Sequence, residues 1–342
     1  MTVIAYGCRP AALTEQEKQK VNELARNLKT HCVGRYLIDM PADVLMSGGA
    51  TVDGVEIDAE EMSHEAYGQE IADRKAKLRG TKSLDAYPFL YAEDRVDGPD
   101  TYYFLHRGTL GYGPSSRVIE AYKWDRGYRF KLVIGASDYL HPDQTHEPHV
   151  REFSIKNDVP EKERLVFDMI RRLRARTEDE IPTEAGICFF GGFLPGKAGN
   201  KEDVGAQFVL AGNRDVSIGL GSDSGIQESD TLLQRGAEIS RGLGSIGGAT
   251  VRKGTVKLQG IDAEEWIITG KTSLGVRGTK CLLEANSTTS NAQSPLLSLD
   301  LNTGSPNAFM QDRIDAASMS TSEAIAVWGV ISRTLRPRPN GF

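Results

Sequence analysis

Three histidines close together, in the stretch HPDQTHEPH, are the residues of this sequence best suited to metal chemistry. They are His141, His146 and His149. Three imidazoles can hold a zinc ion and leave one coordination position for a reacting water. The stretch nevertheless contains two prolines and lacks the i, i+4 spacing that places two histidines on one helix face. The pattern favours a solvated loop between domains, and a metal-dependent hydrolase is kept as an alternative function.

Two glycine-rich stretches invite comparison with phosphate-binding loops. GLGSIG, at residues 242–247, has the GxGxxG spacing, but a dinucleotide site needs it between a strand and a helix. Here the pattern predicts a helix before it and a strand after it. GLGSDSG, at 219–225, lacks the Lys-Ser/Thr of a P-loop, and no GxSxG nucleophile elbow occurs in the sequence. These observations predict no cofactor and favour a binding protein over an enzyme.

Acidic and aromatic residues are the remaining candidates. The acids of VDGVEIDAEEM, at 52–62, alternate along an expected strand edge, where charge discourages aggregation and can also meet a basic partner. Phe189, Phe190 and Phe193 stand beside several glycines. Core packing is the favoured interpretation of these aromatics, and an exposed contact loop is the alternative.

Length and composition limit the kind of protein. A chain of 342 residues exceeds the size of most single cores, so we expect two domains. A net charge of −6, spread along the chain, disfavours nucleic acid as a partner. No stretch approaches the roughly 20 apolar residues of a membrane span. No export signal follows Met1, but AYGCRP, at 5–10, weakly resembles the end of a lipoprotein signal. A trimmed start is kept as an alternative, in which membrane anchoring would be limited to the native precursor.

The four cysteines leave the disulfide state open. They are Cys8, Cys32, Cys188 and Cys281, and none forms a CxxC pair. Four buried thiols and two disulfide bridges are both consistent with this count. If bridges exist, Cys8–Cys32 and Cys188–Cys281 would keep each bond within one half of the chain.

The expected elements define an α+β fold. Capping boxes at Thr14/Glu17 and Ser320/Glu323 begin the first and last helices, and Ser63, Asp158 and Ser229 are expected to cap three others. Alternating patterns predict strands at 32–39, 49–58 (broken by an Asp-Gly turn), 88–94, 101–108, 116–123, 128–135, 188 onward, 205–220, 252–259, 263–270, 278–285 and 296–301. The two halves share one element order. We therefore predict two α+β domains, 1–158 and 159–342, each a mostly antiparallel sheet with flanking helices.

One stretch carries a resemblance to a known family. CVGRYLIDMPADVLMSGG resembles the N-terminal signature of bacterial immunity proteins that neutralise class-four lipase effectors of the type VI secretion system. Members open with Cys-x-Gly-Arg-[FY]-x-[IV]-Asp-[LM]-Pro, matched here by Cys32, Gly34, Arg35, Tyr36, Ile38, Asp39, Met40 and Pro41. GICFFGGF, VGAQFVL and IGLGSDSG resemble the family's C-terminal domain. The resemblance covers roughly residues 30–335.

The resemblance implies a non-enzymatic, two-domain inhibitor in the periplasm of a Gram-negative bacterium. Its partner would be a phospholipase of the α/β-hydrolase fold with a mobile cap. The two domains would clamp the cap and catalytic modules and prevent opening of the lid. A periplasmic scaffold or lipoprotein without a toxin partner is the other alternative. As partner contacts we select acidic and aromatic positions at expected loops and edges: Asp53, Glu56, Asp58, Phe193, Asp223 and Asp230.

Overall fold

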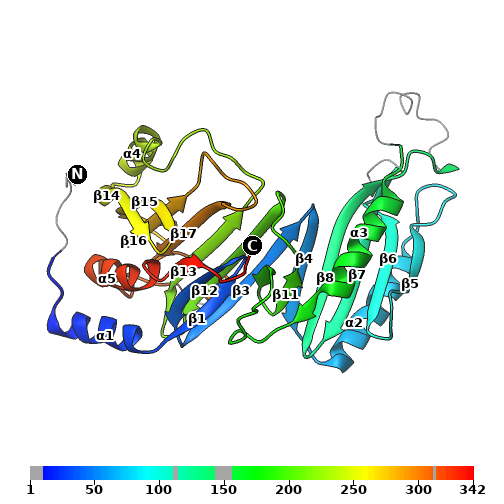
Figure 1. Ribbon diagram of the computed structural model, residues 1–342, viewed down its shortest axis with the longest axis horizontal. Helices are drawn as coiled ribbons and strands as arrows, with labels where there is room; N and C mark the ends of the chain where they lie inside the picture. Colours follow the sequence, from blue (N-terminus) through cyan, green and yellow to red (C-terminus); the bar gives the residue numbers. More distant parts are fainter. Residues whose placement is uncertain (1–10, 111–114, 143–155, 311–312) are drawn as a thin grey trace. The chain divides into compact units, whose positions relative to one another are not determined.

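The computed structural model describes residues 11–110, 115–142, 156–310 and 313–342 of the chain (Figure 1). Its contacts divide the chain into two compact units. Unit 1 comprises residues 1–48, 178–190 and 196–342, and unit 2 comprises residues 49–177 and 191–195. None of the helices in the described residues has the length and apolar character of a membrane span.

Unit 1 is built on a mostly antiparallel sheet. Its strands follow the order β14-β15-β16-β17-β13-β12-β3, and β1, β2 and β18 form a separate small sheet. The elements of the described part are α1 (Glu15–Arg26), β1 (Leu28–Val33), β2 (Tyr36–Pro41), β10 (Gly186–Phe189), β12 (Glu202–Leu210), β13 (Asn213–Asp223), α4 (Gly236–Ser245), β14 (Ala249–Leu258), β15 (Ile261–Lys271), β16 (Arg277–Ala285), β17 (Leu296–Asn302), α5 (Thr321–Ser332) and β18 (Arg336–Pro337).

Unit 2 contains antiparallel strands and two helices. Its strand order is β3-β4-β8-β7-β6-β5, and β3 appears in both units because the boundary at 48/49 lies within it. The elements are β3 (Val44–Val52), β4 (Val55–Glu61), α2 (His64–Gly80), β5 (Leu90–Arg95), β6 (Thr101–Arg107), β7 (Ser116–Asp125), β8 (Tyr128–Ser137), α3 (Val159–Arg172), β9 (Arg174–Ala175) and β11 (Gly192–Pro195). The predicted α+β class with mostly antiparallel strands is confirmed.

The two helices of unit 2 cover opposite faces of its sheet. Tyr67, on α2, belongs to a buried cluster with Phe104 and Tyr122. Phe167, on α3, packs edge-on against Tyr103, with 4.8 Å between ring centroids. Because neighbouring residues of a strand point to opposite faces, Tyr103 and Phe104 of β6 serve different helices. Figure 1 shows α3 lying along this sheet.

Helix α5 packs against α1 and against strands β2, β16 and β17 of unit 1 (Figure 1). Trp328 of α5 is fully buried, and its indole donates to Oε2 of Glu265 at 2.7 Å. Glu265 is also buried, and its carboxylate pairs with Arg252 at 2.9 Å and Arg333 at 3.0 Å. A buried charge needs such partners to offset its lost hydration.

Three of the five expected helix caps are confirmed. Thr14 and Ser320 form complete capping boxes, and Ser63 accepts from the backbone of Ala66. Asp158 precedes α3 but makes no capping bond, because its carboxylate instead accepts from the backbone of Ser137 at 2.7 Å. Ser229 does not begin a helix at all. Its hydroxyl donates to the neighbouring Asp230, and α4 begins at Gly236.

The stretch 32–41 is a hairpin, not the single strand expected at 32–39. Gly34 has a φ of +57°, a conformation that glycine adopts readily, and it turns the chain between β1 and β2. By contrast, the Asp-Gly turn at 53–54 joins β3 and β4 as predicted, with φ values of 50° and 81°. GLGSIG closes α4 and leads into β14, as its expected role as a turn requires.

Candidate partner-binding surface

A disulfide joins the 32–41 hairpin to β10. The sulfurs of Cys32 and Cys188 are bonded, with 5.6 Å between the Cα atoms, and both residues are fully buried. Cys281 is a free, buried cysteine, and burial raises the pKa of its thiol far above the usual range. The expected pairings Cys8–Cys32 and Cys188–Cys281 are therefore wrong, although Cys8 itself lies outside the described residues.

Arg35 lies in the same hairpin as Cys32 and forms a second link from this hairpin to distant parts of the chain. Its Nε and Nη2 donate to the two carboxylate oxygens of Glu202 at 2.8 and 2.7 Å. Its Nη1 donates to the carbonyl oxygens of Gly196 and Gly341. Arg35 is only 3% exposed, and the planar guanidinium suits this two-oxygen geometry.

Arg338 fixes the same region from the other end of the chain. Its guanidinium is buried and donates to the carbonyl oxygens of Pro182, Glu184 and Gly186. Its backbone nitrogen donates to the carbonyl oxygen of Arg35 at 2.8 Å. The residues that carry the family resemblance therefore hold three distant parts of unit 1 together and are not exposed for chemistry.

Three of the six selected contact residues lie on one hairpin of unit 2. Asp53 stands in the β3–β4 turn, and Glu56 and Asp58 are exposed on β4. Asp58 pairs with Arg129, Nη1 to Oδ2, at 2.5 Å. Glu56 has no ion pair within the described part of the chain. The strand edge expected for these acids is wrong, because β4 lies between β3 and β8 in the sheet, and the acids instead alternate with buried residues along a paired strand. We use the name acidic edge only as a label for Asp53, Glu56, Asp58 and Glu60.

The other three selected residues belong to other parts of the chain. Phe193 is fully buried in β11, with the guanidinium of Arg174 4.8 Å from its ring centre. This supports the core interpretation of that aromatic. Asp223 ends β13 and accepts from the backbone of Gly225 and Ile226, so it stabilises a turn. Asp230 is exposed in unit 1.

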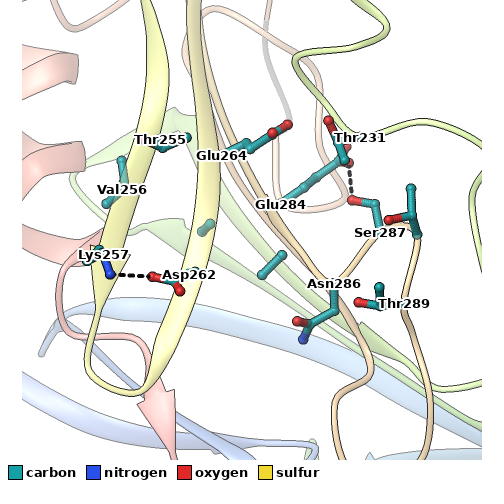
Figure 2. Close-up of a pocket in the computed structure, with 13 residues that line it drawn as sticks. Thr231, Thr255, Val256, Lys257, Asp262, Glu264, Glu284, Asn286, Ser287 and Thr289 are labelled. Carbon is teal, nitrogen blue, oxygen red and sulfur yellow. Dashed lines mark hydrogen bonds and ion pairs between the residues drawn. The ribbon is translucent and has the colours of Figure 1, made fainter. Parts of the chain in front are cut away.

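A polar cavity of about 470 Å³ in unit 1 was not expected from the sequence (Figure 2). It is open to solvent and lies over the ends of β14, β15 and β16. Glu264 and Glu284 face each other across β15 and β16, and both line the cavity. Glu284 also pairs with Arg235, and it accepts from the hydroxyl of Ser287 at 3.1 Å. No histidine or cysteine lines this cavity, so Ser287 has no imidazole base beside it.

A buried polar cluster beneath α2 is the closest approach to a catalytic arrangement. Glu120 accepts from Arg74 at 2.6 and 2.8 Å and from the Tyr122 hydroxyl at 3.0 Å, and His106 Nε2 lies 3.4 Å away. Burial alone would raise the pKa of Glu120, but His106, Arg74 and the charge of Lys131 outweigh it and hold that pKa well below its ordinary value. All but Arg74 and Lys131 are buried, so the cluster fixes α2 to the sheet and faces no substrate.

The histidine segment contributes no visible metal centre. The His141 ring packs edge-on against Tyr87 and Tyr91, with centroids 5.8 and 5.1 Å apart. His146 and His149 lie outside the described residues. Among the residues that are described, no three His, Cys, Asp or Glu side chains gather as metal ligands would.

These features describe a two-unit α+β protein with exposed acids along β4 and a disulfide between the 32–41 hairpin and β10. Comparison with protein families is specific. The model of the Tle cognate immunity protein 4 N-terminal domain matches residues 29–176, and that of the C-terminal domain matches residues 180–340. The chain belongs to the Tle cognate immunity protein 4 family. This confirms the resemblance seen in residues 32–41, and it makes the chain a non-enzymatic immunity protein and not a metal-dependent hydrolase.

Solved structures share the fold at low sequence identity. A chain of the Tle4–Tli4 complex crystal structure is 18% identical, with a TM-score of 0.71 over 93% of this chain and 99% of that chain. The apo immunity protein TplEi of the type VI secretion system of Pseudomonas aeruginosa is 20% identical, with a TM-score of 0.69 over 92% and 98%. TplEi complexed with an "L" peptide is also 20% identical, with a TM-score of 0.64 over 92% and 99%. No curated protein gives a significant match.

Proposed function

We propose that this protein binds and neutralises a cognate lipase effector of the Tle4 type, delivered by the type VI secretion system. The observation that carries the proposal is the match of both immunity-domain models, which between them span residues 29–176 and 180–340. The fold shared with a chain of the Tle4–Tli4 complex supports the choice of partner class. An inhibitor of this kind needs area and complementarity, and a stable interface buries roughly 1,200–2,000 Å².

The mechanism that we propose is a clamp on the lid of the lipase. Two arms of similar element order would hold the cap and catalytic modules together, so that lipid cannot enter. Lid opening is a frequent control point in enzymes that sequester their substrates. The predicted domains 1–158 and 159–342 are the proposed arms, and their boundary stays a prediction. The presence of two compact units in this chain supports a two-armed inhibitor.

The acidic edge is the contact surface that we favour on unit 2, with Asp223 and Asp230 as further contacts on unit 1. Its alternating carboxylates would meet a basic patch on the lipase. Glu56 is the residue best placed for this, since it is exposed and pairs with no cation in the described chain. Phe193 is the weakest of the six selected contacts because its side chain is buried.

We place the protein in the periplasm, where a toxin that attacks membrane lipid would meet it. The Cys32–Cys188 disulfide is consistent with a location outside the cytoplasm, because such bonds persist in oxidising compartments.

The direct test mixes the purified chain with the purified cognate lipase and phospholipid vesicles. Stoichiometric loss of hydrolysis is expected, and unchanged hydrolysis at excess chain would refute the proposed function. The clamp is tested separately by hydrogen exchange of the lipase. We expect slower exchange in both the cap and the catalytic module on binding. Protection of the catalytic module alone would leave inhibition intact but rule out the clamp.

A further inference from the structure

A second cavity of unit 1, also of about 470 Å³, lies between α1 and the start of α5. Figure 1 shows α1 beside α5. The turn between β12 and β13 contributes Gly212 and Asn213 to the wall of the cavity. Four apolar side chains form much of the remaining wall: Val21, Leu24, Met319 and Val327. A volume of this size is typical of sites that take a small organic molecule.

Glu323 supplies a buried carboxylate to this cavity. The residue is only 6% exposed, and its Oε2 accepts from the backbone nitrogen of Ser320 at 2.8 Å, in the capping box of α5. Its Oε1 lies 3.8 Å from Nζ of Lys20, which is beyond hydrogen-bond distance. Within the described part of the chain, no other group donates to this oxygen. A largely buried carboxylate oxygen without a donor is poorly solvated, so a cationic N–H group that enters the cavity would bind it favourably.

The charges around the cavity favour a cation as its ligand. Glu323 and Glu23 line it, and Lys20 is the only cation among the described residues that does so. The side chain of Lys20 is 58% exposed, so solvent weakens its attraction to Glu323 and it can move aside at little cost. Apolar walls do not suit a metal ion, which prefers a shell of oxygen ligands. They do suit the aliphatic stem of an ammonium or guanidinium group.

Helix α1 is held in place by contacts outside the cavity. The Ser320 hydroxyl donates to Oε1 of Glu17 at 2.6 Å. The Ser322 hydroxyl donates to the carbonyl oxygen of Ala11 at 2.7 Å. These bonds fix the beginning of α1 to the beginning of α5, so the wall that α1 provides is formed before any ligand binds. Helix α1 also lies outside the residues matched by either family model, so the cavity depends on a helix that those models do not include.

We propose that the cavity between α1 and α5 binds a small organic cation, an alkylamine or alkylguanidine with a stem of about four carbons. The cationic head donates to Oε1 of Glu323 and displaces Lys20 into solvent. The stem packs against Leu24, Met319 and Val327. This site does not depend on the proposed inhibition of a lipase.

The test titrates n-butylguanidinium into the isotopically labelled full chain and follows the backbone amide resonances of Gly212, Asn213 and Ser318, which line the cavity. N-butylurea, which has a similar shape without the charge, is the control ligand. We expect saturable shifts at millimolar n-butylguanidinium and none with N-butylurea. Equal shifts with the two compounds, or no shift with either, would overturn the proposal.

Two variants should change the affinity for n-butylguanidinium in opposite directions. Glu323→Gln removes the charge but keeps the capping box, in which glutamine also serves, and should weaken binding about 10-fold. Lys20→Met removes the competing ammonium and should tighten binding about 2- to 5-fold. Glu17→Gln, in the capping box of α1, is the matched control and should bind as wild type does. Unchanged affinity in Glu323→Gln, or an affinity of Lys20→Met no higher than that of wild type, would overturn the proposal.

A last arm separates a free small molecule from a basic side chain of a protein partner, because both present the same cationic group. The titration is repeated on the chain saturated with its cognate lipase, and we expect n-butylguanidinium to bind as before. Displacement by the lipase would assign the cavity to a lysine or arginine of that enzyme and overturn a small-molecule site. Failure of the chain to bind the lipase would refute the proposed function, whereas the titration of the free chain would still decide the cavity.

Discussion

Arg35, which is buried, and Glu202, which is partly buried and 167 residues away in the sequence, form an ion pair with two parallel hydrogen bonds of 2.8 and 2.7 Å. Arg35 belongs to the phrase that carries the family resemblance, and Glu202 begins β12 of the large sheet. The pair joins the small hairpin sheet to the large sheet within unit 1. Because Arg35 also donates to Gly196 and Gly341, one side chain connects four segments.

Removing that guanidinium should destabilise the protein strongly. Arg35→Ala leaves the Glu202 carboxylate partly buried without its cation, which typically costs about 3–5 kcal/mol of unfolding free energy. Arg35→Lys should recover only part of this, since an ammonium cannot bind both carboxylate oxygens in parallel. Urea unfolding measures both changes. Lys18→Ala, which breaks the exposed pair with Glu15, is the control and should cost less than about 1 kcal/mol. Equal losses for Arg35→Ala and Lys18→Ala would contradict this role.

The disulfide should make stability depend on redox conditions. A bridge that closes a loop of 156 residues is expected to contribute about 3–5 kcal/mol, mainly by restricting the unfolded chain. We expect dithiothreitol to lower the thermal midpoint of wild type when it is added before unfolding. Cys32→Ala/Cys188→Ala should already melt at that lower temperature and should not respond to reductant. A wild-type midpoint that is insensitive to full reduction would show that the bridge is dispensable.

Glu120 should make the unfolding free energy of the protein decrease at acidic pH. Its folded pKa lies below the ordinary value of 4.5, so the stabilisation is fully present above about pH 4.5 and declines as the pH falls below it. Glu120→Gln should be less stable than wild type at pH 7 and should lose less stability between pH 7 and pH 3. Urea midpoints across that range measure the difference. Glu15→Gln, at an exposed position of α1, should follow wild type, and parallel curves for wild type and Glu120→Gln would contradict the prediction.

Charge reversal on the acidic edge should change association with the lipase. Glu56→Lys should slow association about 3- to 10-fold at low salt, and the effect should shrink as salt is raised. Stopped-flow association rates at several salt concentrations measure this. Glu23→Lys, an exposed reversal on α1, is the control for net charge. Asp58→Lys is less informative because it also breaks the ion pair with Arg129. If Glu56→Lys and Glu23→Lys act alike, the acidic edge is not the contact surface.

Much of the fold could be predicted because the signals are local. The capping boxes at Thr14 and Ser320 place their helices directly, and the Asp53-Gly54 turn with alternating neighbours defines a hairpin. Expected caps were wrong where a distant partner competed. Asp158 binds the backbone of Ser137, 21 residues earlier, and no nearby sequence signal specifies that contact.

The candidate site was less predictable for the same reason. The Cys32–Cys188 pairing depends on β10 lying beside β1, and strand neighbours far apart in sequence are not encoded by periodicity. The cavity beside Glu264 and Glu284 depends on the register of β15 and β16, which brings two carboxylates opposite each other. Glu56 and Asp58 could be recognised as exposed acids because polar and apolar residues alternate along a half-buried strand, and the polar positions face solvent.

The Cys32–Cys188 bond closes a covalent ring, and residues 49–177 lie entirely on that ring. A protease cut within those residues leaves every fragment attached until the sulfur link is reduced. Evolution could likewise lengthen, shorten or exchange that segment without releasing the part of the chain that closes the ring. This arrangement would let residues 49–177 diversify while the covalent link between Cys32 and Cys188 in unit 1 stays the same.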